Sequence, residues 1–184
     1  MNLIETGFAD LLLIEPRVFG DSRGHFFESY NEKVFAEGGI KIRFVQDNQS
    51  RSSYGVIRGL HFQKDPYAQT KLVRVLNGSI LDVAVDLRKG SHTYGKHFSV
   101  ELSAENKRQL LVPKGFAHGF SVLSETADVL YKCDAFYHKE SEAGILYNDS
   151  SLNIDWRIPI GNAIVSDKDL QQPSFAAYQA ELTV

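Results

Sequence analysis

The chain has 184 residues, of which 43% are hydrophobic and 11% aromatic, so residues 1–184 can form one globular domain with a full core. Its 20 basic and 23 acidic groups give a formal net charge of -3 and form no block of like charges, which argues against nucleic-acid and polybasic membrane partners. The longest aliphatic run, residues 11–14, is far shorter than the roughly 20 residues of a membrane-spanning helix, and acidic residues at positions 5 and 10 are unlike a signal peptide, so we expect a cytoplasmic protein.

Short apolar and β-branched segments recur at close spacing along the chain and predict strands. In chain order they cover residues 10–14, 25–30, 56–62, 71–76, 80–85, 97–102, 109–112 and 127–133. Asn77-Gly78 lies between two of them and is a strong hairpin signal. Helices are expected only at the periphery, one capped by Asn31 and ending before Gly38-Gly39, and one after Asp167. The pattern predicts an all-β fold, an antiparallel jelly-roll barrel with a few short helices.

Alternation along two of these strands directs polar side chains toward apolar surroundings. In residues 71–76, Lys71 and Arg74 lie on opposite faces that are otherwise apolar. In the last predicted strand, Tyr131 shares an apolar face with Cys133, the only cysteine, which excludes an internal disulfide. Because a buried lysine or tyrosine needs a partner or a function, Lys71 and Tyr131 are candidate site residues.

Two of the six histidines stand in apolar strand contexts. His61 follows Arg58-Gly59-Leu60, and His118 lies in a glycine-flanked aromatic segment, residues 113–120. Arg58 and His61 would lie on opposite faces of a regular strand, but Gly59 is placed to introduce a bulge that turns one of them. Both histidines are therefore candidates for the site.

The histidine pattern also tests a metal-dependent interpretation. In the metal-binding cupins, a His-x-His pair, a following Glu and a distant His surround one ion. Here the first part reads His61-Phe62-Gln63, so the second histidine is missing, and no glutamate follows within several residues. Catalytic metal sites usually have three protein ligands, so we expect no metal and no other cofactor, and the histidines are free for acid–base chemistry. A metal-dependent cupin enzyme remains a more distant alternative.

Nine motifs, taken together and in order, carry a resemblance that covers nearly the whole chain. They comprise residues 19–24, 26–30, 45–48, 58–63, 71–74, 103–110, 113–120, 131–132 and 166–169. This set resembles the dTDP-4-dehydrorhamnose 3,5-epimerase family, whose members are metal-free jelly-roll enzymes of the cupin class. The resemblance implies an isomerase that converts dTDP-4-dehydro-6-deoxy-D-glucose to dTDP-4-dehydro-L-rhamnose in dTDP-rhamnose biosynthesis, which supplies sugar for lipopolysaccharide and other surface polysaccharides.

The chemistry of such a reaction explains the polar residues found above. A ketone at C4 makes the hydrogens on C3 and C5 removable, so inversion needs a base, an acid on the opposite face and a group that stabilises the enolate. The resemblance implies that His61 is the base, oriented by Asp169. It further implies that Tyr131 is the acid and that Lys71 stabilises the developing oxyanion.

Further positions match the substrate contacts of the family. Arg23 and Arg58 match its diphosphate ligands, and Tyr137 matches the aromatic ring that stacks on thymine. The remaining implied contacts are Glu28, Gln46, Asp47, Asn48, His118, Glu142 and Lys168. Family members are homodimers that exchange an N-terminal segment, so Arg23 and Glu28 are expected to serve the pocket of the partner.

Two other functions use the same residues differently. A single-centre epimerase, which inverts only C3 or only C5 of a related nucleotide sugar, needs the same acid and base as the double epimerase. A protein that binds sugar nucleotides without catalysis would not need them, so the retention of His61, Lys71, Tyr131 and Asp169 argues for an enzyme. The residues do not separate dTDP from UDP or CDP sugars.

Overall fold

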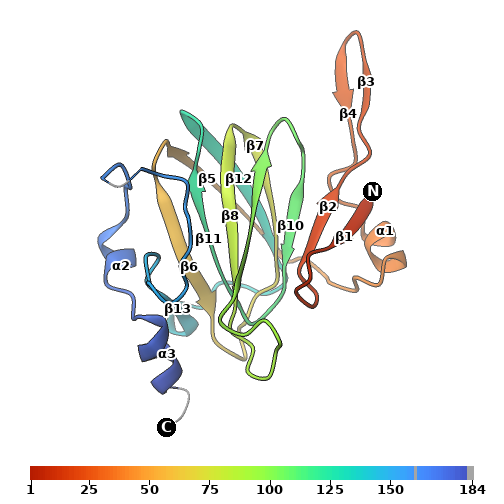
Figure 1. The fold of residues 1–184 in the computed structure, drawn as a ribbon. Coiled ribbons are helices and arrows are strands. Elements are labelled where there is room, and N and C mark those ends of the chain that lie inside the picture. Colours follow the sequence, from red (N-terminus) through yellow and green to blue (C-terminus); the bar gives the residue numbers. More distant parts are fainter. Residues whose placement is uncertain (160, 182–184) are drawn as a thin grey trace.

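The computed structural model describes residues 1–159 and 161–181, and two antiparallel sheets pack face to face in it (Figure 1). The six-stranded sheet has the order β1 (Asn2–Glu5), β2 (Leu12–Glu15), β10 (Gln109–Val112), β7 (Lys71–Asn77), β12 (Thr126–Cys133) and β5 (Gln46–Ser53). The five-stranded sheet has the order β13 (Glu142–Gly144), β6 (Ile57–Gln63), β11 (Phe116–Val122), β8 (Ser79–Asp86) and β9 (His97–Ser103). The expected all-β antiparallel jelly-roll class is confirmed.

The remaining elements are short and lie at the periphery, as expected. A hairpin of β3 (Phe19–Asp21) and β4 (Gly24–Phe26) projects away from the sheets, and the helices are α1 (Glu32–Glu37), α2 (Asp167–Leu170) and α3 (Phe175–Glu181), with a 3-10 turn at Lys139–Ser141 (Figure 1). Asn31 caps α1, because its side chain accepts hydrogen bonds from the backbone of Lys33 and Val34. Among the described residues no helix has the length and hydropathy needed to cross a membrane.

Two local predictions are wrong. Asn77-Gly78 makes a tight turn, but it does not join a hairpin pair, because β7 and β8 enter different sheets. Both edges of β7 are already occupied by β10 and β12, which are distant in the sequence. The expected strand at residues 25–30 is also too long, since β4 ends at Phe26. Pairing with distant strands decides the first case, and a local pattern does not contain it. In the second case β4 pairs with its sequence neighbour β3, and the pairing ends at Phe26.

The core explains why β7 is apolar on both faces. Val73 and Val75 point between the sheets and pack with side chains from both, including Ile80 of β8. On the outer face, Leu72 is covered by Phe35 of α1. The outside of the five-stranded sheet is covered in the same way by the C-terminal segment, which contributes Trp156, Phe175 and Tyr178. Both sheets are thus shielded on two faces over part of their area.

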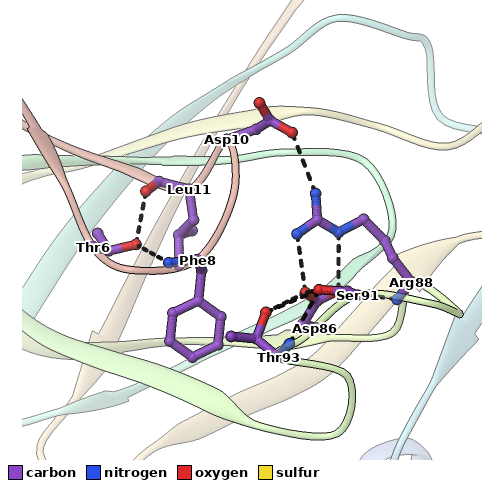
Figure 2. Close-up of polar contacts among 8 residues, drawn as sticks. All are labelled: Thr6, Phe8, Asp10, Leu11, Asp86, Arg88, Ser91 and Thr93. Carbon is purple, nitrogen blue, oxygen red and sulfur yellow. Dashed lines mark hydrogen bonds and ion pairs between the residues drawn. The ribbon is translucent and has the colours of Figure 1, made fainter.

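One end of the sandwich is organised by the carboxylate of Asp86, which is fully buried (Figure 2). It accepts hydrogen bonds from the backbone and guanidinium of Arg88 and from the hydroxyls of Ser91 and Thr93 at 2.6 and 2.7 Å. Burial alone would raise the pKa of Asp86, but these hydrogen bonds lower it to about 2. Arg88 also pairs with Asp10 at 3.3 Å and so ties this loop to the turn between β1 and β2.

Candidate active site

A cavity of about 290 Å³ receives side chains from both sheets. His61 reaches it from the five-stranded sheet, and Lys71 and Tyr131 reach it from the six-stranded sheet. The full lining is Gln46, Asn48, His61, Phe62, Gln63, Gln69, Lys71, Tyr131, Tyr137 and Glu142. The cavity therefore brings together seven of the residues that the sequence predicted for the site.

His61 is held by a buried carboxylate. Its Nε2 lies 2.6 Å from Oδ1 of Asp169, which is 4% exposed and whose other oxygen accepts a 3.3 Å hydrogen bond from the backbone of Gly59. Burial alone would raise the pKa of Asp169, but its contacts with His61, Gly59 and Ser166 outweigh burial and lower it. Because Asp169 stays ionised, Nε2 carries the hydrogen that it donates, and Nδ1 is the nitrogen that can accept a proton.

Helix α2 places Asp169 against β6. Ser166 caps this short helix, because its hydroxyl accepts a hydrogen bond from the backbone of Asp169 at 3.2 Å. The cap fixes the backbone from which the carboxylate reaches His61, 108 positions earlier in the chain. The pair expected from the resemblance thus has the geometry of a base and its orienting partner.

A bulge in β6 brings Arg58 to the same side as His61. His61 lies opposite His118 and Arg58 lies opposite Phe120, so three steps along β6 match two along β11. The extra residue falls beside Gly59, which has a φ of 129°. The bulge expected at Gly59 is confirmed. Because of it, Arg58 and His61 do not lie on opposite faces of β6, as they would in a regular strand.

The space next to this bulge requires a second glycine. A Cβ on Gly119 of β11 would lie 2.7 Å from the carbonyl oxygen of Arg58. Arg58 itself donates from Nε to the hydroxyl of Ser52 at 3.0 Å, and its positive charge lies close enough to Tyr131 to act on the phenol. The bulge therefore places a cation beside the predicted acid.

Tyr131 and Lys71 lie together on the opposite wall. The Lys71 ammonium is 5.8 Å from the centre of the Tyr131 ring. Burial raises the pKa of Tyr131 above its usual value of 10.0, so the phenol keeps its proton at neutral pH and can donate it. Burial lowers the pKa of Lys71, while nearby groups that include Asp82 and Glu142 oppose this shift. The inward orientation predicted from strand alternation is confirmed for both side chains.

Three polar residues form a chain at the rim of the cavity. The hydroxyl of Tyr137 donates to Glu142 at 2.9 Å, and the other oxygen of Glu142 lies 2.6 Å from the Lys168 ammonium. The backbone N–H of Tyr137 donates to Gln46 at 3.1 Å. Tyr137 is 54% exposed, so its ring remains open to a ligand on at least one side.

His118 occupies a buried position behind the lining. Its Nε2 lies 2.8 Å from Oδ1 of Asp82, and neither residue lines the cavity. In the described ranges, Oδ2 of Asp82 is the one fully buried side-chain polar atom with no hydrogen-bond partner. His118 is nevertheless next to the site, because it lies directly opposite His61 in the pairing of β11 with β6. Asp82 was not predicted, although alternation along β8 puts it on the inner face with Ile80.

Seven predicted residues do not line this cavity, and three of them also have their partners away from it. Asp47 is on the other face of β5 from Gln46 and Asn48, where it pairs with Lys132 at 3.0 Å. Arg23 and Glu28 belong to the hairpin that projects from the sheets and to the segment after it (Figure 1). Arg23 pairs there with Asp21, and Glu28 accepts a hydrogen bond from Asn31. These residues do not reach the cavity of their own chain.

Phe62, Gln63 and Gln69 line the cavity but were not predicted as site residues. Gln63 drew attention only as the residue that replaces a metal-binding histidine, and Gln69 had no recognisable signal. Within residues 1–159 and 161–181, no group of three or more His, Cys, Asp or Glu side chains is arranged to hold a metal ion.

Comparison with known proteins gives a consistent result. The family model described as dTDP-4-dehydrorhamnose 3,5-epimerase matches residues 5–177. The chain is similar to the dTDP-4-dehydrorhamnose 3,5-epimerase of Shigella flexneri, with 57% identity over 176 residues, which are 95% of this chain and 96% of the other.

Solved structures of similar epimerases give the same result. The crystal structure of dTDP-4-dehydrorhamnose 3,5-epimerase from Elizabethkingia anophelis NUHP1 has 58% identity and a TM-score of 0.93, covering 96% of this chain and 97% of that chain. An epimerase from Legionella pneumophila Philadelphia 1, solved in complex with dTDP-4-keto-L-rhamnose, has 51% identity and a TM-score of 0.93, covering 98% and 96%.

Proposed function

Because this chain belongs to the dTDP-4-dehydrorhamnose 3,5-epimerase family, we propose that it inverts C3 and C5 of dTDP-4-dehydro-6-deoxy-D-glucose with His61 as base and Tyr131 as acid. The product is dTDP-4-dehydro-L-rhamnose. The observation that carries the assignment is that His61 and Tyr131 enter one cavity from opposite sheets. Inversion needs proton removal on one face of the sugar and proton delivery on the other, and this placement supports both.

Each inversion is a proton removal followed by a proton delivery. Nδ1 of His61 takes the proton from the carbon next to the ketone, and the electron pair of the broken C–H bond moves into the carbonyl to form an enolate. Lys71 stabilises the enolate oxygen, and Asp169 stabilises the imidazolium. Tyr131 then gives its proton to the opposite face of the same carbon. Exchange with solvent restores both groups for the second centre.

The nucleotide half of the substrate would lie toward the rim. Arg58 supplies a guanidinium for the diphosphate, for which its planar fork is suited. The exposed ring of Tyr137 offers a stacking surface for the thymine. Glu142 accepts the hydrogen bond of the Tyr137 hydroxyl and is itself paired with Lys168. The predicted contacts Gln46 and Asn48 would complete the site from the cavity wall, and His118 from behind it.

We propose further that residues 1–184 act as one domain of a cytoplasmic homodimer. The projecting hairpin presents Arg23 together with two exposed aromatic rings, Phe19 and Phe26, which are 52% and 69% exposed. A second copy of the chain would cover these rings and receive Arg23 and Glu28 at its pocket. This arrangement accounts for two predicted substrate contacts that their own cavity lacks.

The proposal is tested by incubation of the protein with dTDP-4-keto-6-deoxyglucose in deuterated water, followed by mass and proton spectra of the product. Deuterium at both C3 and C5 is expected. Label at one carbon would identify a single-centre epimerase, and no label would refute the proposal.

The same assay tests Tyr131. Tyr131→Phe removes only the hydroxyl and should slow epimerisation by roughly 10²–10⁴-fold, the range for a lost general acid, while dTDP binding stays nearly unchanged. Tyr54→Phe is the matched control, because Tyr54 is 41% exposed and does not line the cavity. A Tyr131→Phe variant as active as the control would remove the acid assignment.

A further inference from the structure

The backbone around Tyr137 is held by two glutamine side chains. The Nε2 group of Gln63 donates to the carbonyl of Phe136 at 3.3 Å, and its Oε1 accepts from the backbone N–H of His138 at 2.7 Å. Gln46 accepts from the N–H of Tyr137 itself. Side chains from β5 and β6 therefore fix three successive residues, and Gln63 binds the chain on both sides of Tyr137.

A second set of contacts joins the preceding loop to the same segment. Nε2 of Gln63 also donates to the carbonyl of Tyr67 at 2.6 Å. The Tyr67 ring stacks on the His138 ring, with a centroid distance of 3.7 Å and an angle of 2° between the planes. Gln69 donates to the carbonyl of Ala135 at 2.8 Å. Gln63 thus forms hydrogen bonds to the backbone of both loops.

The hydrogen bonds of Gln63 leave it little to offer a ligand. A carboxamide has two N–H donors, and the two carbonyls of Tyr67 and Phe136 use both. Its oxygen already accepts from His138, and the residue is only 6% exposed. Although Gln63 borders the cavity, its chemistry is directed at the protein backbone. An effect of Gln63 on binding would therefore pass through the segment that it holds.

We propose that Gln63 is a positioning residue for nucleotide binding, which fixes the backbone of residues 136–138 so that the Tyr137 ring is ready to stack on a nucleobase. An exposed ring on a free loop would lose conformational freedom when the ligand binds, whereas here that ordering is completed during folding. The inference rests on the proposed function, because the ligand is taken to be a nucleoside diphosphate sugar.

The test replaces Gln63 by methionine, which has a similar length and no polar group to bond with the backbone. Binding of dTDP is measured by calorimetry, and kcat and KM are measured with the deuterium assay. We expect Kd for dTDP and KM to rise roughly 3- to 10-fold, the range expected for loss of an aromatic stacking contact, with kcat within about 2-fold of the parent. If the methionine variant fails to fold, Gln63→Glu keeps the acceptor for His138, loses both donor bonds and should weaken binding in the same direction.

Two further variants separate positioning from general destabilisation. Ser121→Ala removes another buried side chain–backbone hydrogen bond, 2.7 Å to the carbonyl of Trp156, and should lower stability while the Kd for dTDP stays unchanged. In a Tyr137→Ala background, the effect of Gln63→Met on Kd should disappear.

An effect of Gln63→Met that persists without Tyr137, or a Kd equal to the parent while Tyr137→Ala weakens binding, would overturn the inference and leave the proposed function intact. Parent protein that neither binds dTDP nor incorporates deuterium would overturn both.

Discussion

Replacement of Asp86 by asparagine should destabilise the protein in a way that depends on pH. The hydrogen bonds in Figure 2 hold the pKa of this carboxyl at about 2, compared with 3.8 in the unfolded chain. At about 1.36 kcal/mol per pH unit, this difference contributes roughly 2.4 kcal/mol to stability at neutral pH. Asp86→Asn removes the charge and places an amide among donors, so we expect a loss of at least that size and a melting temperature lower by roughly 5–10 °C.

The sign of the pH dependence follows from the lowered pKa. The contribution is fully present above pH 3.8 and is lost as the pH falls through about 2, because the folded protein must then also take up the proton. The stability difference between parent and variant should therefore fall to roughly half its neutral value at pH 3. Urea unfolding at pH 7, 5, 4 and 3 measures it, with Trp156, the only tryptophan, as the fluorescent probe.

Asp10→Asn is the matched control for this series. Asp10 also contacts Arg88, but its side chain is 77% exposed, so its loss should change stability by no more than about 0.5 kcal/mol. An Asp86→Asn variant as stable as the Asp10→Asn variant at pH 7 would refute the reasoning. So would a stability difference between Asp86→Asn and the parent that is the same at pH 3 as at pH 7.

Two other substitutions probe the cavity itself. Lys71→Met should lower kcat by roughly 10²–10³-fold in the deuterium assay, which is the effect of losing one oxyanion-stabilising group. The melting temperature of this variant should stay equal or rise, because a buried ammonium is removed. A variant with the kcat of the parent would contradict the role of Lys71. Gly119→Ala places a methyl group 2.7 Å from the carbonyl of Arg58, so thermal melting should show a loss of stability of roughly 1–3 kcal/mol. The value of kcat should also fall, because His61 is displaced. Unchanged melting and kcat would contradict this prediction, since β6 and β11 would then accommodate the methyl group without loss of stability.

The predictions of the site that succeeded rest on sequence patterns within single strands. Alternation along β7 and β12 is a property of neighbouring residues, so the inward side chains of Lys71 and Tyr131 could be identified without knowledge of the partner strands. The bulge at Gly59 is similar, because the sequence signal for it was the glycine itself, whose φ of 129° other residues rarely adopt. Local patterns therefore located these inward side chains, although they misread the Asn77-Gly78 turn and the length of β4.

Most features that the sequence did not predict depend on partners that are distant in the sequence. β5, with the sequence Gln-Asp-Asn-Gln-Ser-Arg-Ser-Ser, is an edge strand without an apolar alternation, and its pairing with β12 is what makes it a strand. The contact of His61 with Asp169 spans 108 positions and came from the family resemblance, not from the pattern. The role of Gln63 was missed for the same reason, since its partners lie in two loops that sequence alone does not bring together.

The residues proposed for proton transfer and those proposed for nucleotide binding are supported differently. His61, Lys71 and Tyr131 stand on strands that are paired on both sides, so their backbone is fixed by the sheet hydrogen bonds. Tyr137 stands on a loop segment whose backbone is fixed by glutamine side chains. A substitution in the first group alters the sheet or the reacting groups and should appear in kcat. A substitution of a glutamine that holds the loop should change the affinity for the nucleotide. Changes in this loop can therefore alter which nucleotide the protein prefers without moving the catalytic strands.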